Sequence, residues 1–294
     1  MNRVEDIEPW TIARVVRWAG EDFRRRGLDS PRLDAELLLA HALGVDRIRV
    51  IIDAARTLGP DELARYRELI RRRRAREPLA YILGEREFYG LLFRVDARVL
   101  VPRADSEALV DVALERTQSW SVYGRALDLC TGSGCVAVAF AKRRGGWHVT
   151  GVDLSGDAVE LARENASRSG VIWGAAFFAG SLFEPLASGA RFELVTANPP
   201  YIPSAEVETL APEIRGFEPR LALDGGPDGL GVTRRIVSEA RSRLVPGGLL
   251  AVETHHDQGE RVAALFAEAG YVSIERRRDY GGHERVVSGV RGSD

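Results

Sequence analysis

The chain has 294 residues, of which 45% are hydrophobic and 29% are charged, and its formal net charge is −2 at pH 7. This length allows two domains, or one large domain with a smaller appendage, and the composition excludes an intrinsically disordered or fibrous protein. The nearly balanced charge argues against a protein whose main function is to bind the phosphate backbone of DNA, because affinity for that backbone comes from clustered Lys and Arg side chains.

No segment predicts secretion or membrane insertion. No apolar run approaches the roughly 18 residues that cross a bilayer, and the first residues include acids where a secretory signal needs a basic stretch. We therefore expect a cytoplasmic protein without membrane contact. Its only cysteines, Cys130 and Cys135, are expected to be reduced and inert; a redox role is the alternative, because a helix N-terminus can lower the pKa of a thiol.

The N-terminal quarter of the chain predicts a set of helices. Apolar residues recur there at three- and four-residue spacing between residues 8 and 76. Ser30 and Pro31 suit the N-cap and the first residue of one helix, and Gly59 precedes another.

The predicted helix that follows Gly59 ends in four consecutive arginines, Arg71–Arg74. Residues 1–76 as a whole carry four more basic than acidic side chains, whereas residues 77–294 carry six more acidic than basic ones. The arginine run is typical of a solvated helix face, and weak contact with the ribosome or RNA is the alternative.

The remainder of the chain changes pattern twice. Residues 77–104 contain Pro78, Gly84 and Gly90 between alternating segments, which predicts a short β-hairpin that links two domains. From residue 105 onward, apolar strands alternate with amphipathic helices, which indicates parallel βαβ units with helices on both faces of a sheet. The predicted strands are 125–130, 147–153, 175–180, 192–197 and 249–254, and the predicted helices are 106–117, 135–144, 157–167 and 233–244.

A glycine-containing turn follows the first of these strands. Gly132 and Gly134 allow a ligand to approach the backbone at the carboxyl end of the strand. Asp153 ends the next strand, about 20 residues on, where a carboxylate can accept hydrogen bonds from two ribose hydroxyls. Asp128 can face the ammonium group of an amino-acid moiety. These residues predict an adenosine ligand that carries an amino acid; capping of the next helix is the alternative role for Asp153.

Asn198, Pro199, Pro200 and Tyr201 directly follow a later strand. The two prolines fix φ and donate no hydrogen bond, so the turn is rigid and its carbonyls are free to accept. The side-chain oxygen of Asn198 and the carbonyl of Pro199 can each accept a hydrogen bond from one NH2 group, while Tyr201 offers a flat face to a planar amide or base. The motif predicts methyl transfer to such a nitrogen; a turn without chemistry is the alternative.

Together, the segments DLCTGSG, VDLSGDAVELARENA and NPPYIP resemble the class I S-adenosylmethionine-dependent methyltransferases that act on amino groups. The segments EFYG, VLVPRADSE, GFEPRLALDGGPDGL and RDYGGHERVV resemble, more narrowly, the peptide chain release factor glutamine methyltransferases of the HemK type. RLDAELLLAHALG and REPLAYILGEREFYG extend the similarity to the N-terminal helices, so that it covers nearly the whole chain.

The resemblance implies an α/β fold, namely a seven-stranded, Rossmann-like methyltransferase domain behind a small all-helical domain and a linking β-hairpin. The implied boundaries are 1–76 for a helical substrate-recognition domain, 77–104 for the hairpin linker and 105–294 for the methyltransferase domain. The implied reaction is methylation of the side-chain amide of the glutamine in the GGQ loop of bacterial class I release factors. S-Adenosylmethionine would be the donor and S-adenosylhomocysteine the product, with no metal, and the protein would be a monomer.

The resemblance also assigns residues to roles. The implied cofactor-binding residues are Asp128, Cys130, Thr131, Gly132, Ser133, Gly134, Asp153, Leu182 and Asn198. The implied catalytic residues are Asn198, Pro199 and Tyr201, and the implied substrate contacts are these three with Pro200, Arg103 and Glu107.

Four positions depart from the family pattern. Cys130 replaces a glycine, Ala104 replaces a proline, Ser181 replaces an acidic residue, and the stretch that begins at Glu253 reads Glu-Thr-His-His where the family has an EHG-like sequence. Cys130 would crowd the methionine end of the cofactor, and Ser181 removes an acceptor for the adenine amino group. We therefore expect retained activity with weaker cofactor affinity.

Three other functions remain as alternatives on the sequence alone. Adenine-N6 methylation of nucleic acid would use the same motif on an extruded base. Glutamine methylation of a ribosomal protein would use it on another protein amide, and a catalytically silent binding module would use only the fold. A metal site is not expected, because the adjacent His255 and His256 would point to opposite faces of a strand.

Overall fold

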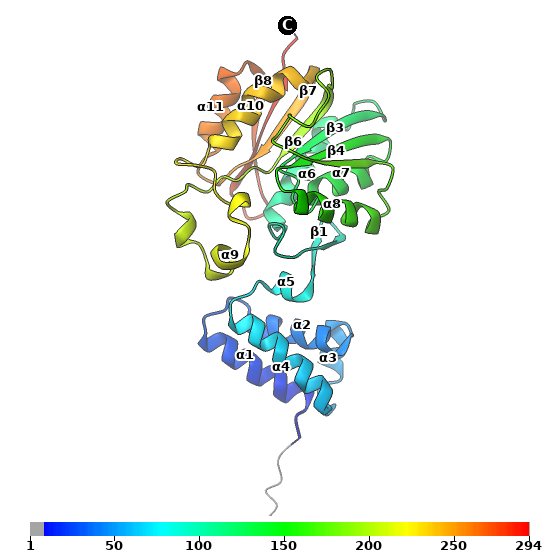
Figure 1. The fold of residues 1–294 in the computed structure, drawn as a ribbon, viewed down its shortest axis with the longest axis vertical. Coiled ribbons are helices and arrows are strands. Elements are labelled where there is room, and N and C mark those ends of the chain that lie inside the picture. Colours follow the sequence, from blue (N-terminus) through cyan, green and yellow to red (C-terminus); the bar gives the residue numbers. More distant parts are fainter. Residues whose placement is uncertain (1–8, 294) are drawn as a thin grey trace, which may run out of the picture. The chain divides into compact units, whose positions relative to one another are not determined.

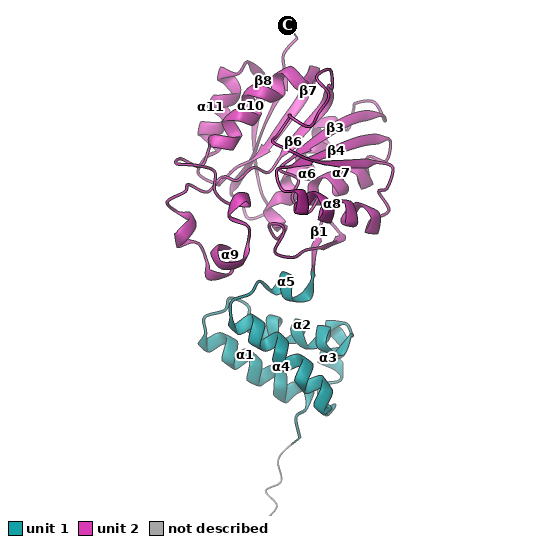
Figure 2. Ribbon diagram, in the orientation of Figure 1, with its two compact units in different colours: residues 1–84 teal, residues 85–294 magenta. Residues whose placement is uncertain are grey.

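The computed structural model describes residues 9–293, and the chain divides after Gly84 into two compact units (Figure 2). Among the described residues, no helix is both long enough and apolar enough to span a membrane.

The first unit is entirely helical and has its own apolar core. Its helices are α1 (Ile12–Arg25), α2 (Pro31–Leu43), α3 (Arg47–Ile52), α4 (Pro60–Arg74) and α5 (Leu79–Leu83). Ser30 is the N-cap of α2 and Pro31 is its first residue, as the sequence predicts. Phe23, Leu38 and Tyr66 are almost completely buried and bring α1, α2 and α4 together.

The arginine run at the end of α4 is engaged in ion pairs. The guanidinium of Arg73 is buried and lies 2.8 Å from the carboxylate of Asp34 in α2. The other three arginines pair with Glu68, Glu77 and Asp22. The expectation of a solvated helix face is therefore wrong for Arg73, whose charge joins two helices inside the unit.

The second unit begins with the predicted hairpin, β1 (Glu85–Phe88) and β2 (Leu91–Arg94). Tyr89 and Gly90 form its two-residue turn with φ of 53° and 74°, as a turn that matches the twist of a hairpin requires. The backbone N–H of Arg94 donates to Asn165 Oδ1 at 2.8 Å, so the hairpin packs within the second unit. Residues 77–104 are thus divided, with α5 in the first unit and the hairpin in the second.

A seven-stranded sheet, in the order β5-β4-β3-β6-β7-β9-β8, forms the centre of the second unit (Figure 1). Its strands are β3 (Gly124–Leu129), β4 (Trp147–Asp153), β5 (Ala175–Ala179), β6 (Phe192–Ala197), β7 (Leu244–Glu253), β8 (Tyr271–Arg278) and β9 (Glu284–Arg291). Strands β3 to β7 are parallel to one another, whereas β9 is antiparallel to both β7 and β8. The five predicted strands are confirmed, although β7 begins at Leu244 rather than at residue 249.

Helices cover both faces of this sheet (Figure 1). They are α6 (Glu107–Thr117), α7 (Cys135–Arg143), α8 (Gly156–Arg168), α10 (Gly231–Arg243) and α11 (Gly259–Glu268). The short α9 (Pro212–Phe217) lies in the connection between β6 and α10 and buries none of its residues. Along β3, Ala126 faces the core beneath α6, α7 and α8, while Leu127 and Leu129 face the core beneath α10 and α11. Side chains of successive strand residues point to opposite faces, so one apolar strand serves both cores.

The order of the strands determines where a ligand can enter. From β3 the chain proceeds outward through β4 to β5, and it then returns to the other side of β3 through β6 and β7. In open α/β sheets, ligands bind outside the carboxyl ends of the strands at the point where this order reverses. Residues that follow β3, β4 and β6 therefore meet at one place.

Candidate active site

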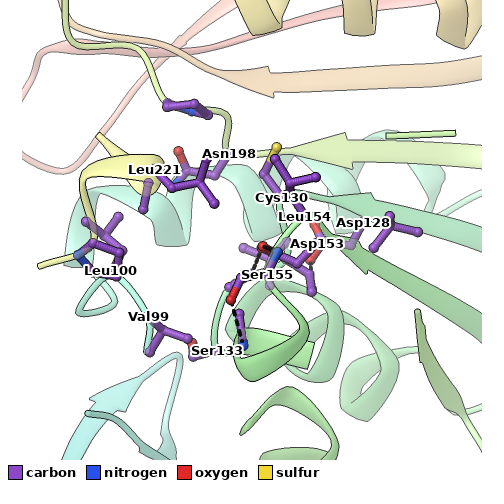
Figure 3. Close-up of a pocket in the computed structure, with 18 of the residues that line it drawn as sticks. Val99, Leu100, Asp128, Cys130, Ser133, Asp153, Leu154, Ser155, Asn198 and Leu221 are labelled. Carbon is purple, nitrogen blue, oxygen red and sulfur yellow. Dashed lines mark hydrogen bonds between the residues drawn. The ribbon is translucent and has the colours of Figure 1, made fainter. Parts of the chain in front are cut away.

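A cavity of about 210 Å³ opens at this place (Figure 3). The predicted site residues that line it are Arg103, Asp128, Cys130, Thr131, Gly132, Ser133, Asp153, Leu182, Asn198 and Pro200. Gly134, Glu107, Pro199 and Tyr201 do not line it, although Pro199 and Tyr201 flank residues that do. Most of the residues that the sequence places at a site are therefore brought together by the fold.

Asp128 is held rigidly at the end of β3. Its Oδ2 accepts a hydrogen bond from Thr131 Oγ1 at 2.6 Å, and its Oδ1 accepts one from Thr196 Oγ1 at 2.8 Å. Burial raises the pKa of Asp128 to about 6, because the charged form loses its hydration. A cation beside this carboxylate would favour its charged form, which suits an ammonium group.

Asp153 connects the end of β4 to the glycine turn. Its Oδ2 accepts from the N–H of Gly132 at 2.8 Å, and its Oδ1 accepts from the N–H of Ser155 at 2.9 Å. The N-cap of α8 is Ser155, whose hydroxyl accepts from the N–H of Ala158, so helix capping by Asp153 is wrong. Figure 3 shows Asp153 and Ser155 beside the pocket, where each carboxylate oxygen has a second lone pair for a ligand.

The turn between β3 and α7 requires left-handed backbone conformations. Gly134 has φ of 78°, and a Cβ there would lie 3.0 Å from the Cβ of Ala162, so this glycine serves the close packing of α7 on α8. Cys130 has φ of 56° with a side chain in place, a conformation that favours glycine. Burial raises the pKa of Cys130 and that of Cys135, the latter to about 12, so both stay as thiols and the redox alternative loses its basis.

Asn198 follows β6 and faces the pocket (Figure 3). Its Nδ2 donates a hydrogen bond of 3.2 Å to the hydroxyl of Ser106, which lines the same pocket from the start of α6. With Nδ2 engaged in this way, the side-chain oxygen of Asn198 is the atom left to meet a donor.

Both the backbone and the side chain of Tyr201 are held by hydrogen bonds. Its backbone carbonyl accepts from Gln258 Nε2 at 2.9 Å, and its hydroxyl lies 3.5 Å from Oε1 of Glu253 at the end of β7. Glu253 is 1% exposed, and burial raises its pKa to about 7. Its Oε2 is buried and has no hydrogen-bond partner among the described residues.

The two predicted substrate contacts of the PRADSE segment have different surroundings. Arg103 lines the pocket and forms an ion pair with Glu218, which also accepts from the N–H of Val101. This pair joins the segments VLVPRADSE and GFEPRLALDGGPDGL at the pocket. Glu107 instead accepts from the N–H of Tyr89 at 2.9 Å and stabilises the turn of the β1-β2 hairpin.

His255 and His256 lie beyond the end of β7 rather than on a strand. Their ring centroids are 4.1 Å apart, so the expectation that they point to opposite faces is wrong. The ring of His283 lies 5.8 Å from that of His256. Even so, no three His, Cys, Asp or Glu side chains of residues 9–293 are placed to hold a metal ion.

Several residues of the pocket have no role assigned to them by the sequence. Val99, Leu100, Leu154 and Leu221 form an apolar wall of the pocket (Figure 3). They lie in the segments VLVPRADSE, VDLSGDAVELARENA and GFEPRLALDGGPDGL, which carry the family resemblance, but the sequence assigns none of them to a site. Ser106 lies within the PRADSE segment, but nothing in that segment indicates its contact with Asn198. Glu253 could have been found by the rule that ligands gather at the carboxyl ends of parallel strands, since β7 ends there beside β6.

Comparisons with known proteins agree with this geometry. The family model described as "PrmC N-terminal domain" matches residues 14–84, and the one described as "Methyltransferase domain" matches residues 126–217. A release factor glutamine methyltransferase of Geobacter sulfurreducens is 45% identical over 97% of this chain and 98% of its own length, and one of Vibrio cholerae is 42% identical over 95% and 96%. Among solved structures, a methyltransferase of Pyrococcus furiosus matches the fold with a TM-score of 0.52 and 18% identity, over 70% of this chain and 91% of its own. The chain therefore belongs to the release factor glutamine methyltransferase family, with the mixed seven-stranded α/β fold of class I methyltransferases.

Proposed function

We propose that the chain methylates the side-chain amide nitrogen of the glutamine in the GGQ loop of bacterial class I release factors, with S-adenosylmethionine as methyl donor. The observation that carries this proposal is the placement of Asn198 at the pocket, with its Nδ2 engaged by Ser106 and its oxygen left for a donor. The full-length similarity to relatives named release factor glutamine methyltransferases supports the choice of substrate.

The pocket suits the proposed donor because it combines two carboxylates with an apolar wall. Asp128 would face the ammonium group and Asp153 the ribose hydroxyls, while Leu154 and Leu182 would contact the adenine. Gly132 leaves open space for close approach to the backbone, since a Cβ there would meet nothing within 4 Å. When bound, S-adenosylmethionine supplies a methyl group activated by its attachment to a sulfonium.

The residues after β6 would position the nucleophile. An amide nitrogen is a poor nucleophile because its lone pair is delocalised. The oxygen of Asn198 and the carbonyl of Pro199 would accept hydrogen bonds from the two amide hydrogens, which raises the electron density on the nitrogen and stabilises the positive charge that develops during attack. Methyl transfer would form an N–C bond at the expense of the donor's S–C bond, and the nitrogen would then release one proton to water. No covalent enzyme intermediate is required.

Asn198→Ala tests this proposal. The variant loses one preorganised acceptor, so we expect its kcat on the release factor to fall roughly thirtyfold or more. This corresponds to a loss of about 2 kcal/mol or more of transition-state stabilisation. Cofactor affinity, measured by calorimetry, should change far less. Near wild-type turnover in the variant would contradict the assignment of Asn198.

A further inference from the structure

The order of the strands indicates which part of the pocket receives the purine base of the proposed donor. Asp128 lies in β3 and Asp153 ends β4, and the next strand outward is β5 (Figure 3). A ligand whose ammonium group faces Asp128 and whose ribose faces Asp153 therefore extends its base toward the carboxyl end of β5. The side chains that line the pocket there are Leu154, Ser181, Leu182, Val232 and Arg235, which we call the base end.

The base end combines apolar walls with two polar side chains. Leu154 follows β4, Leu182 follows β5 and Val232 lies in the first turn of α10. Apolar side chains of this kind suit the flat faces of a base. Its polar edge is left to the hydroxyl of Ser181 and the guanidinium of Arg235.

Arg235 brings hydrogen-bond donors to the base end. Its Nη1 donates to the hydroxyl of Ser181 at 3.4 Å, and its Nε donates to the carboxylate of Glu239 at 3.3 Å. Both bonds are long, and they engage two of the five N–H groups of a guanidinium, which stays charged and has no acceptor. The guanidinium is therefore able to donate to a ligand.

No carboxylate lines the base end beside these donors. Within residues 9–293, the carboxylates that line the pocket are Asp128 and Asp153, which belong to the ammonium and ribose side. Ser181 occupies the position at which the family pattern has an acidic residue. The edge of the base therefore meets a charged donor where an acidic side chain would offer a charged acceptor.

We propose that Arg235 is a specificity-determining residue, which shifts the preference of the base end from an amino group toward an oxygen at position 6 of the purine. An amino group donates hydrogen bonds and is mismatched with a guanidinium, whereas an oxygen accepts from it. Arginine pairs in this way with O6 and N7 of guanine, while the amino edge of adenine pairs with side-chain amides. This inference rests on the proposed function, because it takes an adenosine-bearing methyl donor and its product as the ligands of the pocket.

Calorimetry with two ligands that carry no transferable methyl group tests the proposal without any turnover. One is S-adenosylhomocysteine, and the other is S-inosylhomocysteine, which has an oxygen in place of the amino group at position 6 and a proton on N1. The measured quantity is the selectivity ratio, the Kd of S-adenosylhomocysteine divided by that of S-inosylhomocysteine, for the full-length protein. Contacts with N1 and with the rest of each ligand are common to wild type and variant, so a change in this ratio isolates the substituted side chain.

Arg235→Met should lower the selectivity ratio about tenfold, the scale of discrimination that a bidentate arginine contact gives. The loss should fall on S-inosylhomocysteine, while S-adenosylhomocysteine binds as tightly as before. Methionine is a good helix former, and Arg235 is half-exposed, so α10 is preserved. Arg234→Met is the matched control, because Arg234 precedes it in α10, pairs with Asp228 and does not line the pocket.

Ser181→Asp should also lower the selectivity ratio, because a carboxylate accepts from the amino group and repels an oxygen. A ratio that stays constant in Arg235→Met, including an equal loss of affinity for both ligands, overturns the proposal, since Arg235 then does not contact position 6. A ratio that stays constant in Ser181→Asp, or that falls as far in Arg234→Met as in Arg235→Met, overturns it as well.

The same measurements separate this inference from the proposed function. If the wild type binds S-adenosylhomocysteine but methylates no release factor, the proposed function fails, and the selectivity ratio still decides the role of Arg235. If the wild type methylates the release factor and Arg235→Met has an unchanged ratio, only the inference on Arg235 fails. If neither ligand binds the wild type, both fail.

Discussion

At the scale of single residues, two departures from the family pattern have physical consequences at the pocket. Cys130 adopts φ of 56° with a side chain, a conformation that costs a non-glycine residue on the order of 1 kcal/mol. Ser181 lines the pocket, and its hydroxyl lies 3.4 Å from Arg235. A serine hydroxyl is a weaker acceptor than a carboxylate, so Ser181 would give the adenine end of the proposed donor a weaker partner than an acidic residue would.

Ser181→Asp should restore this partner. We expect the variant to bind S-adenosylmethionine more tightly by about 1 kcal/mol, the typical net value of one hydrogen bond, as measured by calorimetry. Ser181→Ala is the matched control and should bind the donor as the wild type does. Equal affinities of the aspartate and alanine variants would show that this side chain does not contact the adenine.

At the scale of structural elements, a buried ion pair joins two helices of the first unit. Arg73 near the end of α4 and Asp34 near the start of α2 are 7% and 5% exposed, and their charged atoms are 2.8 Å apart. Truncating one partner of a buried ion pair removes the charge that lies closest to the other, which costs far more than losing an exposed pair.

Arg73→Met should therefore lower the free energy of unfolding of the full chain by about 3 kcal/mol or more, measured by chemical denaturation. Arg71→Met is the matched control, since Arg71 lies in the same helix but forms an exposed ion pair with Glu68. We expect no measurable loss in the free energy of unfolding of this variant. Equal effects of the two substitutions would show that burial of the Arg73–Asp34 pair does not set it apart from an exposed pair.

The same elements show how far the sequence predicts this fold. The strands of the parallel region are apolar and buried, and their periodicity is sufficient to place them. Strand β8 escapes prediction because it is mostly exposed and ends in three arginines, and α3 escapes it because it has only six residues. At the pocket, motif residues such as Asp153 and Asn198 are predicted, whereas the contact of Ser106 with Asn198 depends on packing between α6 and β6, which no local pattern encodes.

At the scale of the whole molecule, buried carboxylates make stability depend on pH. The folded-state pKa values of Asp128 and Glu253 are raised to about 6 and about 7, from ordinary values of 3.8 and 4.5. Between the ordinary and the raised values, the folded protein binds more protons than the unfolded chain. The contribution of these two groups to the free energy of unfolding therefore decreases as pH rises from about 4 to about 7.

Glu253→Gln should remove its share of this decrease. The expected share is about 1.4 kcal/mol for each unit that separates the folded and unfolded pKa values, and it appears in denaturation curves recorded on both sides of this pH window. Groups with lowered pKa values, such as Asp22 and Glu36, act mainly below about pH 5, so curves recorded between about pH 5 and about pH 7 separate the effect of Glu253 from theirs. An identical pH dependence in wild type and variant would contradict the raised pKa of Glu253.

Mass spectrometry of a purified release factor, incubated with this protein and S-adenosylmethionine, tests the central claim most directly. We predict that the GGQ peptide gains the mass of one methylene group on its glutamine, and that Asn198→Ala largely abolishes the gain. A GGQ peptide that stays unmodified, while binding of the donor is demonstrated in the same preparation, would contradict the proposed function and direct attention to another protein amide or to adenine in nucleic acid.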